Sequence, residues 1–150
     1  MNIYFVCTGN TCRSPMAEAI LKAKQRSDIA VRSAGIYALE GGEMSENAQC
    51  ALNDENIPHN HISRQVTIED IEWADLILTM TTAHKELLIR SSEMAAQKTY
   101  TLKEYVTPYT APDVSDPFGR DLNTYKQTFY ELQHLIEELL QKQEGDTNSE

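Results

Sequence analysis

The sequence predicts an α/β protein of the three-layer α/β/α type, in which helices cover both faces of a four-stranded parallel sheet. Four short segments of apolar or β-branched residues alternate with segments of helical periodicity, which is typical of βαβ units. A chain of 150 residues is also long enough to enclose one sizeable core. A loop containing glycine follows the first predicted strand, and ligands of such sheets bind beyond the carboxyl ends of the strands.

The first predicted strand covers 3–6, a short apolar run that is rich in β-forming residues. The loop from Cys7 to Arg13 comes next. Ser14 is predicted to be the N-cap of the following helix, with Pro15 at its first position and an end near Arg26.

The middle of the chain continues the alternation of strands and helices. We expect, in order, a strand at 29–33, a helix capped by Ser45, a short helix at 67–73, a strand at 75–79, a helix from Thr81 or Thr82 to Ile89, and a strand at 99–102.

The segment 107–119 contains three prolines and is therefore predicted to be a loop. The final helix has the clearest helical period in the sequence, with core positions from Tyr125 to Leu140. We expect a single domain at 1–143, followed by a polar and disordered tail at 144–150.

The composition restricts the function classes. The chain has 13 Lys and Arg against 23 Asp and Glu, a formal net charge of −10, which argues against nucleic acid and anionic membranes as partners. Three cysteines, without a signal peptide or a long apolar run, predict a cytoplasmic protein. We expect no cofactor and no metal, because His59 and His61 alone make a weak metal site.

The loop from Cys7 to Arg13 has the features of a site for phosphate. Backbone N–H groups of a tight loop and the positive end of a helix converge on an anion. Gly9 permits a positive φ and a close approach of the backbone, and Arg13 adds a planar donor fork that fits two phosphate oxygens. The same positive field favours the thiolate form of Cys7. The pattern indicates a nucleophile directed at phosphorus.

The run Cys7-Thr8-Gly9-Asn10-Thr11-Cys12-Arg13-Ser14 resembles the signature loop of the low-molecular-weight protein tyrosine phosphatase family. The second motif of that family, an Asp-Pro-aromatic sequence near the C-terminus, is matched by Asp116-Pro117-Phe118. Length and chain order also match, so the resemblance covers residues 1 to about 143.

The resemblance implies a hydrolase that acts on phosphorylated proteins through a phosphocysteine intermediate, without a metal, and that releases inorganic phosphate. Cys7 would attack phosphorus, Arg13 would stabilise the charge of the oxygens, and Asp116 would serve as general acid and then as general base. The predicted site comprises the catalytic residues Cys7, Arg13 and Asp116, the substrate- or phosphate-binding residues Thr8, Gly9, Asn10, Thr11, Cys12, Ser14 and Phe118, and Ser33 as a support for Asn10.

Thr11 bears on the substrate. Tyrosine phosphatases of this family usually have an aliphatic residue there, and a threonine resembles the branch that acts on protein phosphoarginine. The hydroxyl of Thr11 and the carboxylate of Asp116 could contact guanidinium nitrogens, and Phe118 could stack on the guanidinium plane. Gly119 stands where tyrosine-specific members often have a second aromatic residue. A protein tyrosine phosphatase of the same family remains the alternative.

Two further features are expected from the loops. Cys12 shares a short loop with Cys7, so a reversible disulfide could make the enzyme redox-sensitive, whereas Cys50 is expected in the core. The loop 37–43 resembles the variable, substrate-facing loop of the family, in which Tyr37 and Leu39 could line the pocket; an ordinary glycine turn is the alternative.

Other function classes explain fewer of these residues. A related arsenate reductase would need further cysteines downstream, and none follows Cys50. A phosphopeptide-binding module would typically lack one of the three catalytic residues. A purely redox thiol protein would leave Arg13 and Asp116 without a role.

Overall fold

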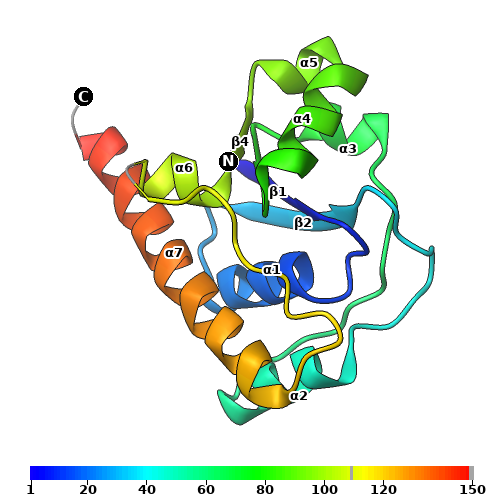
Figure 1. Ribbon diagram of the computed structural model, residues 1–150. Coiled ribbons are helices and arrows are strands. Elements are labelled where there is room, and N and C mark those ends of the chain that lie inside the picture. Colours follow the sequence, from blue (N-terminus) through cyan, green and yellow to red (C-terminus); the bar gives the residue numbers. More distant parts are fainter. Residues whose placement is uncertain (109, 149–150) are drawn as a thin grey trace.

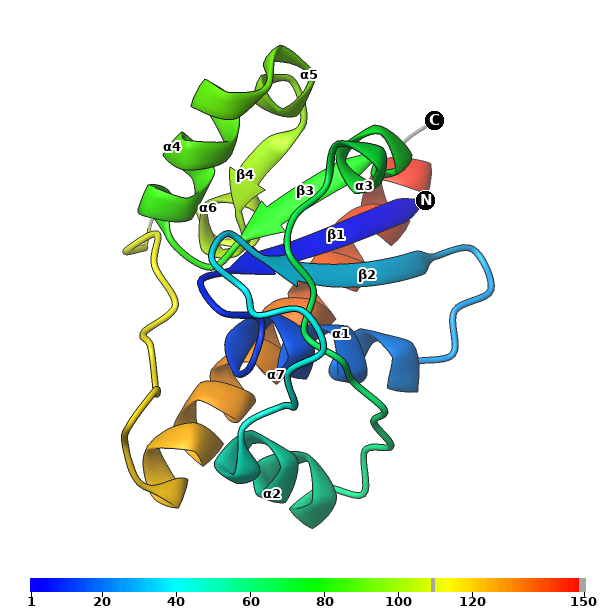
Figure 2. The same ribbon diagram turned by 90° about the vertical axis from the view of Figure 1, so that its right-hand side faces the viewer.

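A computed structural model describes residues 1–108 and 110–148 of the chain (Figure 1). Its centre is a parallel sheet of four strands in the order β2-β1-β3-β4, so the first strand of the sequence lies in the interior of the sheet (Figure 2). The strands are β1 (Asn2–Cys7), β2 (Ala30–Gly35), β3 (Leu76–Thr79) and β4 (Thr99–Thr101).

Helices cover both faces of this sheet, as predicted (Figure 1). One face packs against α1 (Arg13–Ala23) and α7 (Leu122–Asn148), with α2 (Glu46–Asp54) beyond them. The other face packs against α3 (Ile68–Trp73), α4 (Thr82–Ser91) and α5 (Glu93–Ala96). A short helix, α6 (Leu102–Val106), follows β4 and lies against α7. The predicted three-layer α/β/α fold is confirmed.

After Asn2, strand β1 consists of residues with largely apolar side chains, as expected for a strand that is buried on both faces. Ile3 and Phe5 point into the core beside α1 and α7, whereas Tyr4 and Val6 point into the core beside α3 and α4. All four side chains are fully buried. Burial on both faces fixes the position of Cys7 at the carboxyl end of the strand.

Helix α1 differs from its prediction at both ends. It begins at Arg13, and its N-cap residue is Cys12, whose side chain makes no capping hydrogen bond. Ser14 is therefore not the N-cap; its hydroxyl contacts other residues of the preceding loop. The helix ends at Ala23 rather than near Arg26, and Gln25 in the following turn has a φ of 54°.

The C-terminal half contains differences of the same kind. Helices α5 and α6 were not predicted, and β4 ends at Thr101 because this residue forms a capping box with Glu104 at the start of α6. Helix α7 continues to Asn148, into the segment predicted to be a disordered tail, and residues 149–150 of that tail lie outside the described residues. Within the described ranges, no helix is long and apolar enough to cross a membrane.

Candidate functional site

Residues 7–13, which we call the phosphate loop, connect the end of β1 to the start of α1. The residue with a left-handed backbone is Asn10, with a φ of 57°, and not Gly9 as predicted. Asparagine tolerates this conformation better than most other residues do. The end of β2 packs directly beneath the loop: a Cβ on Gly35 would lie 2.5 Å from the carbonyl oxygen of Thr8 and 2.8 Å from the backbone nitrogen of Asn10.

A chain of hydrogen bonds leads from Asn10 to Cys7. The side-chain nitrogen of Asn10 donates to the hydroxyl oxygens of Ser14, at 2.8 Å, and Ser33, at 3.0 Å. The orientation of the Asn10 amide is determined by its Oδ1, which accepts from the backbone N–H of Arg64 at 2.9 Å. The hydroxyl of Ser14 also lies 2.8 Å from the sulfur of Cys7 and 3.4 Å from the carbonyl oxygen of Ala34. Once Cys7 is a thiolate, Ser14 is the donor in their hydrogen bond, because a thiolate has no proton. The expected proximity of Ser33 to Asn10 is present as a hydrogen bond, and its supporting role stays a prediction.

The backbone carbonyl of Asn10 is also fully occupied. It accepts a hydrogen bond from the hydroxyl of Ser63 at 2.7 Å and lies 2.8 Å from Nε2 of His61. Burial lowers the pKa of His61 below its ordinary value. The sequence analysis considered His61 only as part of a weak metal site and did not find Ser63, because the segment 61–65 reaches the loop only through tertiary folding.

Arg13 joins the phosphate loop to the Asp116 loop, by which we mean the described residues of 107–119. Its guanidinium donates to the carbonyl oxygen of Val114 at 3.0 Å and lies 3.4 Å from the carboxylate of Asp116. The side chain of Arg13 is 5% exposed and that of Asp116 is 51% exposed. The arginine is thus part of the interior, while the carboxylate faces the opening of the site.

A pocket of about 250 Å³ lies between these two loops. Phe118 is 71% exposed and stands at its rim. The pocket contains all three predicted catalytic side chains and most of the predicted binding residues. It is lined by Cys7, Thr8, Gly9, Thr11, Cys12, Arg13, Asp116 and Phe118.

Cys12 lines the pocket, and its side chain also contacts α7. Its sulfur lies 3.3 Å from the phenol oxygen of Tyr125 and donates to the hydroxyl of Ser45 at 3.5 Å. Burial and the contact with Cys12 raise the pKa of Tyr125 to about 12. Cys7, Cys12 and Cys50 are all free thiols, and Cys50 is half-buried on α2 rather than in the core. The disulfide between Cys7 and Cys12 stays a prediction.

His84, near the start of α4, contacts the phosphate loop, a contact that the sequence analysis did not identify. It is 7% exposed, and its Nε2 lies 2.8 Å from the hydroxyl of Thr8. Burial, followed by the charge of Arg13, lowers the pKa of His84 to about 4. The imidazole is therefore neutral at pH 7. No local sequence signal marks this contact, because 76 residues separate the two partners.

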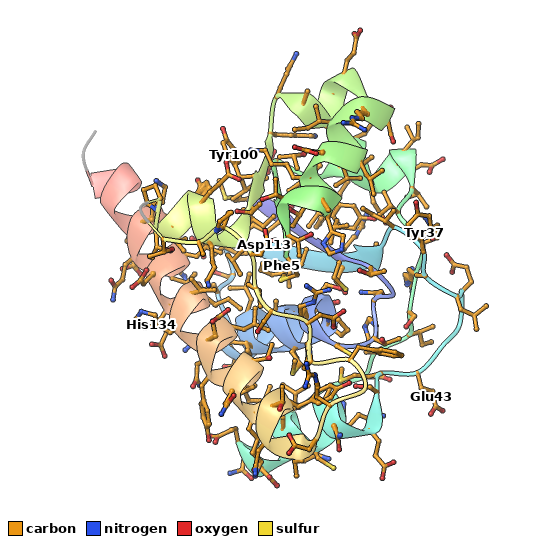
Figure 3. All side chains as sticks on the ribbon, in the orientation of Figure 1. Phe5, Tyr37, Glu43, Tyr100, Asp113 and His134 are labelled. Atoms are coloured by element: carbon orange, nitrogen blue, oxygen red, sulfur yellow. The ribbon has the colours of Figure 1, made fainter. Side chains whose placement is uncertain are left out.

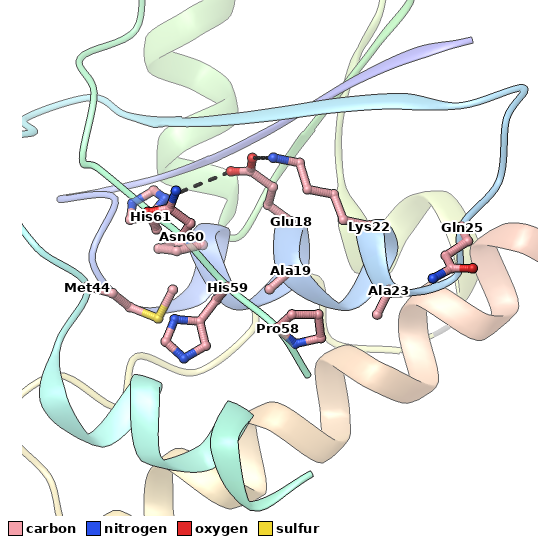
Figure 4. Close-up of a pocket in the computed structure, with 11 residues that line it drawn as sticks. Glu18, Ala19, Lys22, Ala23, Gln25, Met44, Pro58, His59, Asn60 and His61 are labelled. Carbon is pink, nitrogen blue, oxygen red and sulfur yellow. Dashed lines mark hydrogen bonds and ion pairs between the residues drawn. The ribbon is translucent and has the colours of Figure 1, made fainter. Parts of the chain in front are cut away.

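The loop 37–43 does not contribute to this pocket through the residues expected to do so. Tyr37 and Leu39 are 73% and 80% exposed, and the described lining of the pocket includes neither of them. A further pocket of about 480 Å³ lies beside α1 and contains the ion pair between Glu18 and Lys22 together with His61 (Figure 4). Among the described residues, no group of three or more His, Cys, Asp or Glu is placed to hold a metal.

The sequence of the chain is similar to those of known phosphatases. Residues 2–148 match the family described as low molecular weight phosphotyrosine protein phosphatase. A protein-arginine-phosphatase of Bacillus subtilis (strain 168) is 44% identical over 149 residues, 97% of this chain and 99% of the relative. The low molecular weight protein-tyrosine-phosphatase PtpB of Staphylococcus haemolyticus (strain JCSC1435) is 42% identical over 139 residues, 93% of this chain and 97% of the relative.

A solved structure gives the same result for the fold. It is described as a cysteine-to-serine mutant of YwlE arginine phosphatase with a phosphorylated active-site serine. Its TM-score to this chain is 0.93 at 44% identity, and the match covers 100% of both chains. From the matched residues, the shared fold and the paired loops around Cys7 and Asp116, we conclude that the chain belongs to the low molecular weight phosphotyrosine protein phosphatase family.

Proposed function

We propose that this protein is a cysteine-dependent phosphatase that hydrolyses phosphoarginine in proteins. The observation that carries the proposal is that Cys7, Arg13 and Asp116 line a single pocket, and that Thr11, which bears a hydroxyl, lines the same pocket. The first three groups supply nucleophile, anion binding and proton transfer. Thr11 and the leaving group then determine the substrate class.

In the first step the thiolate of Cys7 attacks phosphorus, an S–P bond forms, and the P–N bond of phosphoarginine breaks. The hydroxyl of Ser14 donates to the thiolate, which has no proton of its own, while the oxygen of Ser14 accepts from the amide of Asn10. The guanidinium of Arg13 and the backbone N–H groups of the loop stabilise the negative charge of the phosphoryl oxygens. These positive groups perform the role that a metal has in many other phosphatases.

The leaving nitrogen must receive a proton, because neutral guanidine is a strong base whose conjugate acid has a pKa above about 12. The protonated carboxyl of Asp116 supplies this proton at the opening of the pocket. In the second step the resulting carboxylate removes a proton from water, water attacks phosphorus, the S–P bond breaks, and inorganic phosphate leaves. A relative whose active-site serine is phosphorylated supports the covalent intermediate.

Thr11 supports phosphoarginine as the substrate class. Its side chain lines the pocket together with Asp116 and Phe118, and its hydroxyl lies 3.6 Å from the sulfur of Cys12. A guanidinium group carries several N–H donors, for which a hydroxyl and a carboxylate are suitable acceptors. The name of the B. subtilis relative agrees with this substrate.

A protein tyrosine phosphatase is the second candidate, because one specific observation favours it. Phe118 presents an exposed ring at the rim of the pocket, where the phenol ring of phosphotyrosine could pack against it. The PtpB relative is named as a protein-tyrosine-phosphatase. The physiological partners under either reading are phosphorylated proteins.

A comparison of kcat/KM on phosphoarginine and phosphotyrosine peptides of the same sequence, without added metal, tests the proposal. We expect a higher kcat/KM on phosphoarginine and inhibition by vanadate, a transition-state analogue of phosphoryl transfer. A higher value on phosphotyrosine would replace the first candidate by the second. The cytoplasmic location and the single domain remain part of this proposal, with the change that residues 144–148 continue helix α7.

A further inference from the structure

The first turn of α4 lies between the two loops that form the pocket. From this turn, His84 contacts the phosphate loop through the hydroxyl of Thr8, at 2.8 Å. From the same turn, the backbone nitrogen of Thr82 donates to the carboxylate of Asp113 at 2.8 Å, and its hydroxyl donates to the same oxygen at 3.1 Å. Figure 3 labels Asp113 in the segment that crosses in front of the sheet.

We propose that the first turn of α4 positions the phosphate loop and the Asp116 loop relative to each other, with His84 acting on Thr8 and Asp113 acting on Thr82. The inference rests on the proposed phosphatase function. In-line attack and proton donation occur on opposite sides of the same phosphorus atom. The distance between the nucleophile and the acid must therefore be defined, although they belong to loops that are far apart in the sequence.

The turn is itself rigidly attached to the sheet. The hydroxyl of Thr79, in β3, donates to the carbonyl of Thr81 at 2.9 Å, and the hydroxyl of Thr81 accepts from the backbone N–H of His84 at 3.2 Å. Further along α4, Lys85 is bound to Glu104 of the α6 capping box at 2.7 Å. A contact made from this turn is therefore fixed with respect to the central strands.

His84 is suited to a positioning role rather than to proton transfer. It does not line the pocket in the described structure, and it acts on the loop through Thr8. Its second ring nitrogen, Nδ1, is buried and has no hydrogen-bond partner within the described ranges. A buried polar atom without a partner is costly, and the contact of the other ring nitrogen with Thr8 is the hydrogen bond that offsets this cost.

Asp113 holds the Asp116 loop, to which it belongs, against α4 through its hydrogen bonds with Thr82. The next residue, Val114, donates from its backbone nitrogen to the carbonyl of Met80 at 2.8 Å, and its own carbonyl accepts from Arg13. The backbone of the Asp116 loop is thereby attached to the end of β3 just ahead of the acid. Asp113 is three residues before Asp116 in the sequence, so a shift of one displaces the other.

The first experiment compares His84→Leu, which removes the hydrogen bond, with His84→Gln, whose amide can reach Thr8. His84→Leu should lower kcat about 10-fold on para-nitrophenyl phosphate, weaken vanadate inhibition by a similar factor, and change KM little, because the loss is in transition-state stabilisation. His84→Gln should recover most of the loss. His134→Gln is the matched control, since His134 lies on the outer face of α7 (Figure 3).

The second experiment examines Asp113→Ala with Asp113→Asn, which keeps an accepting oxygen. Asp113→Ala should reduce kcat about 10-fold on phosphoarginine, whose leaving group needs a proton, and much less on para-nitrophenyl phosphate. If the contacts of His84 and Asp113 both act through the first turn of α4, their effects are coupled. The factor by which kcat falls in the double variant His84→Leu/Asp113→Ala should then be smaller than the product of the factors in the single variants.

Each result decides the proposal. An unchanged kcat in His84→Leu, a loss that His84→Gln does not relieve, equal losses of Asp113→Ala on both substrates, or a double variant with multiplicative losses would each overturn it. Failure of the proposed function would be seen separately, as a wild-type protein without turnover of any phosphorylated substrate. Circular dichroism and thermal unfolding of each variant distinguish a local effect from a failure to fold, and the Gln and Asn variants provide the measurement if a stronger variant unfolds.

Discussion

At the scale of single residues, the site depends on which group donates each proton. The amide of Asn10 donates to Ser14, and the hydroxyl of Ser14 lies 2.8 Å from the sulfur of Cys7 and 3.4 Å from the carbonyl of Ala34. Ionisation of Cys7 leaves a sulfur that can only accept, so the proton of Ser14 then points toward the nucleophile. An alcohol in place of the thiol would need no such donor, because it keeps its own proton at neutral pH.

Replacement of Cys7 by serine should abolish turnover and preserve the binding of phosphate. The loop donors and Arg13 remain in place, but an alcohol is a far weaker nucleophile than a thiolate at neutral pH. Steady-state rates and calorimetric titration with inorganic phosphate measure the two properties. Retention of more than about a tenth of the wild-type rate would contradict nucleophilic attack by Cys7.

Asp116→Asn should reduce kcat by an amount that depends on the leaving group. A general acid typically contributes about 10²- to 10⁴-fold, and the full loss is expected for phosphoarginine, whose leaving nitrogen is strongly basic. An activated aryl phosphate should lose much less. Rates on the two substrates provide the measurement, and losses of the same size would argue against proton donation by Asp116.

Thr11→Ile tests the choice of substrate. The change removes a polar partner of the guanidinium, which should lower kcat/KM on phosphoarginine about 5- to 150-fold. The added methyl groups should leave kcat/KM on phosphotyrosine unchanged or improved. Both proteins are measured on both peptides, and an equal decrease on the two substrates would remove Thr11 as a determinant of specificity.

At the scale of elements, the end of β2 limits the shape of the phosphate loop. Gly35 pairs with Cys7 across the sheet, so the loop turns back directly over it. There is no space for a side chain between the two segments. The register of β1 and β2 is thus coupled to the positions of the backbone N–H groups that would bind phosphate.

Gly35→Ala should therefore displace the loop. The added methyl would meet backbone atoms of Thr8 and Asn10, which cannot turn aside as a flexible side chain could. We expect a loss of kcat of about 100-fold and a destabilisation of about 1–3 kcal/mol. Gly145→Ala is the control, because a Cβ there meets no atom within 4 Å. Wild-type activity in Gly35→Ala would show that the loop tolerates displacement.

The contacts between elements also explain which parts of the site can be predicted from the sequence. The phosphate loop and Asp116 belong to short motifs, each of which carries its own chemical signal. Gly35, His61 and His84 contact the loop only because strands and helices from distant parts of the chain meet there. A lone histidine at the start of a helix has no periodic or compositional signal, so its partner cannot be deduced before the topology is known.

The same reasoning applies to the fold. The alternation of strands and helices was sufficient for the class of the fold and for the layers. The boundaries were less predictable where a side chain makes a specific hydrogen bond. Ser14 contacts Cys7 instead of capping α1, and Thr101, the last residue of β4, caps α6, so the strand does not reach residue 102. Local propensity describes both residues correctly as hydrogen-bonding residues but cannot identify their partners.

At the scale of the whole molecule, the burial of His84 makes stability depend on pH. Its pKa is lowered from 6.5 to about 4 in the folded protein, chiefly by burial and then by Arg13. The unfolded chain thus binds a proton at a higher pH than the folded protein does. The contribution of His84 is fully present above pH 6.5 and is lost progressively as the pH falls toward 4.

Between pH 6.5 and 5, this single residue should lower the free energy of unfolding by about 1.5 kcal/mol. Denaturant unfolding of the wild type and of His84→Gln at several pH values measures it. The variant should show a smaller decrease over the same interval, because glutamine does not titrate. Parallel curves for the two proteins would assign the pH dependence to other groups.

The contact between Cys12 and Tyr125 has a consequence for folding during synthesis on the ribosome. The phosphate loop is among the first segments to be synthesised, whereas Tyr125 and the apolar face of α7 that covers α1 are among the last. A nascent chain therefore exposes its reactive cysteines and the uncovered surface of α1 until translation is nearly complete. Cys12 and the apolar surface of α1 are covered only when α7 has emerged and packed against them.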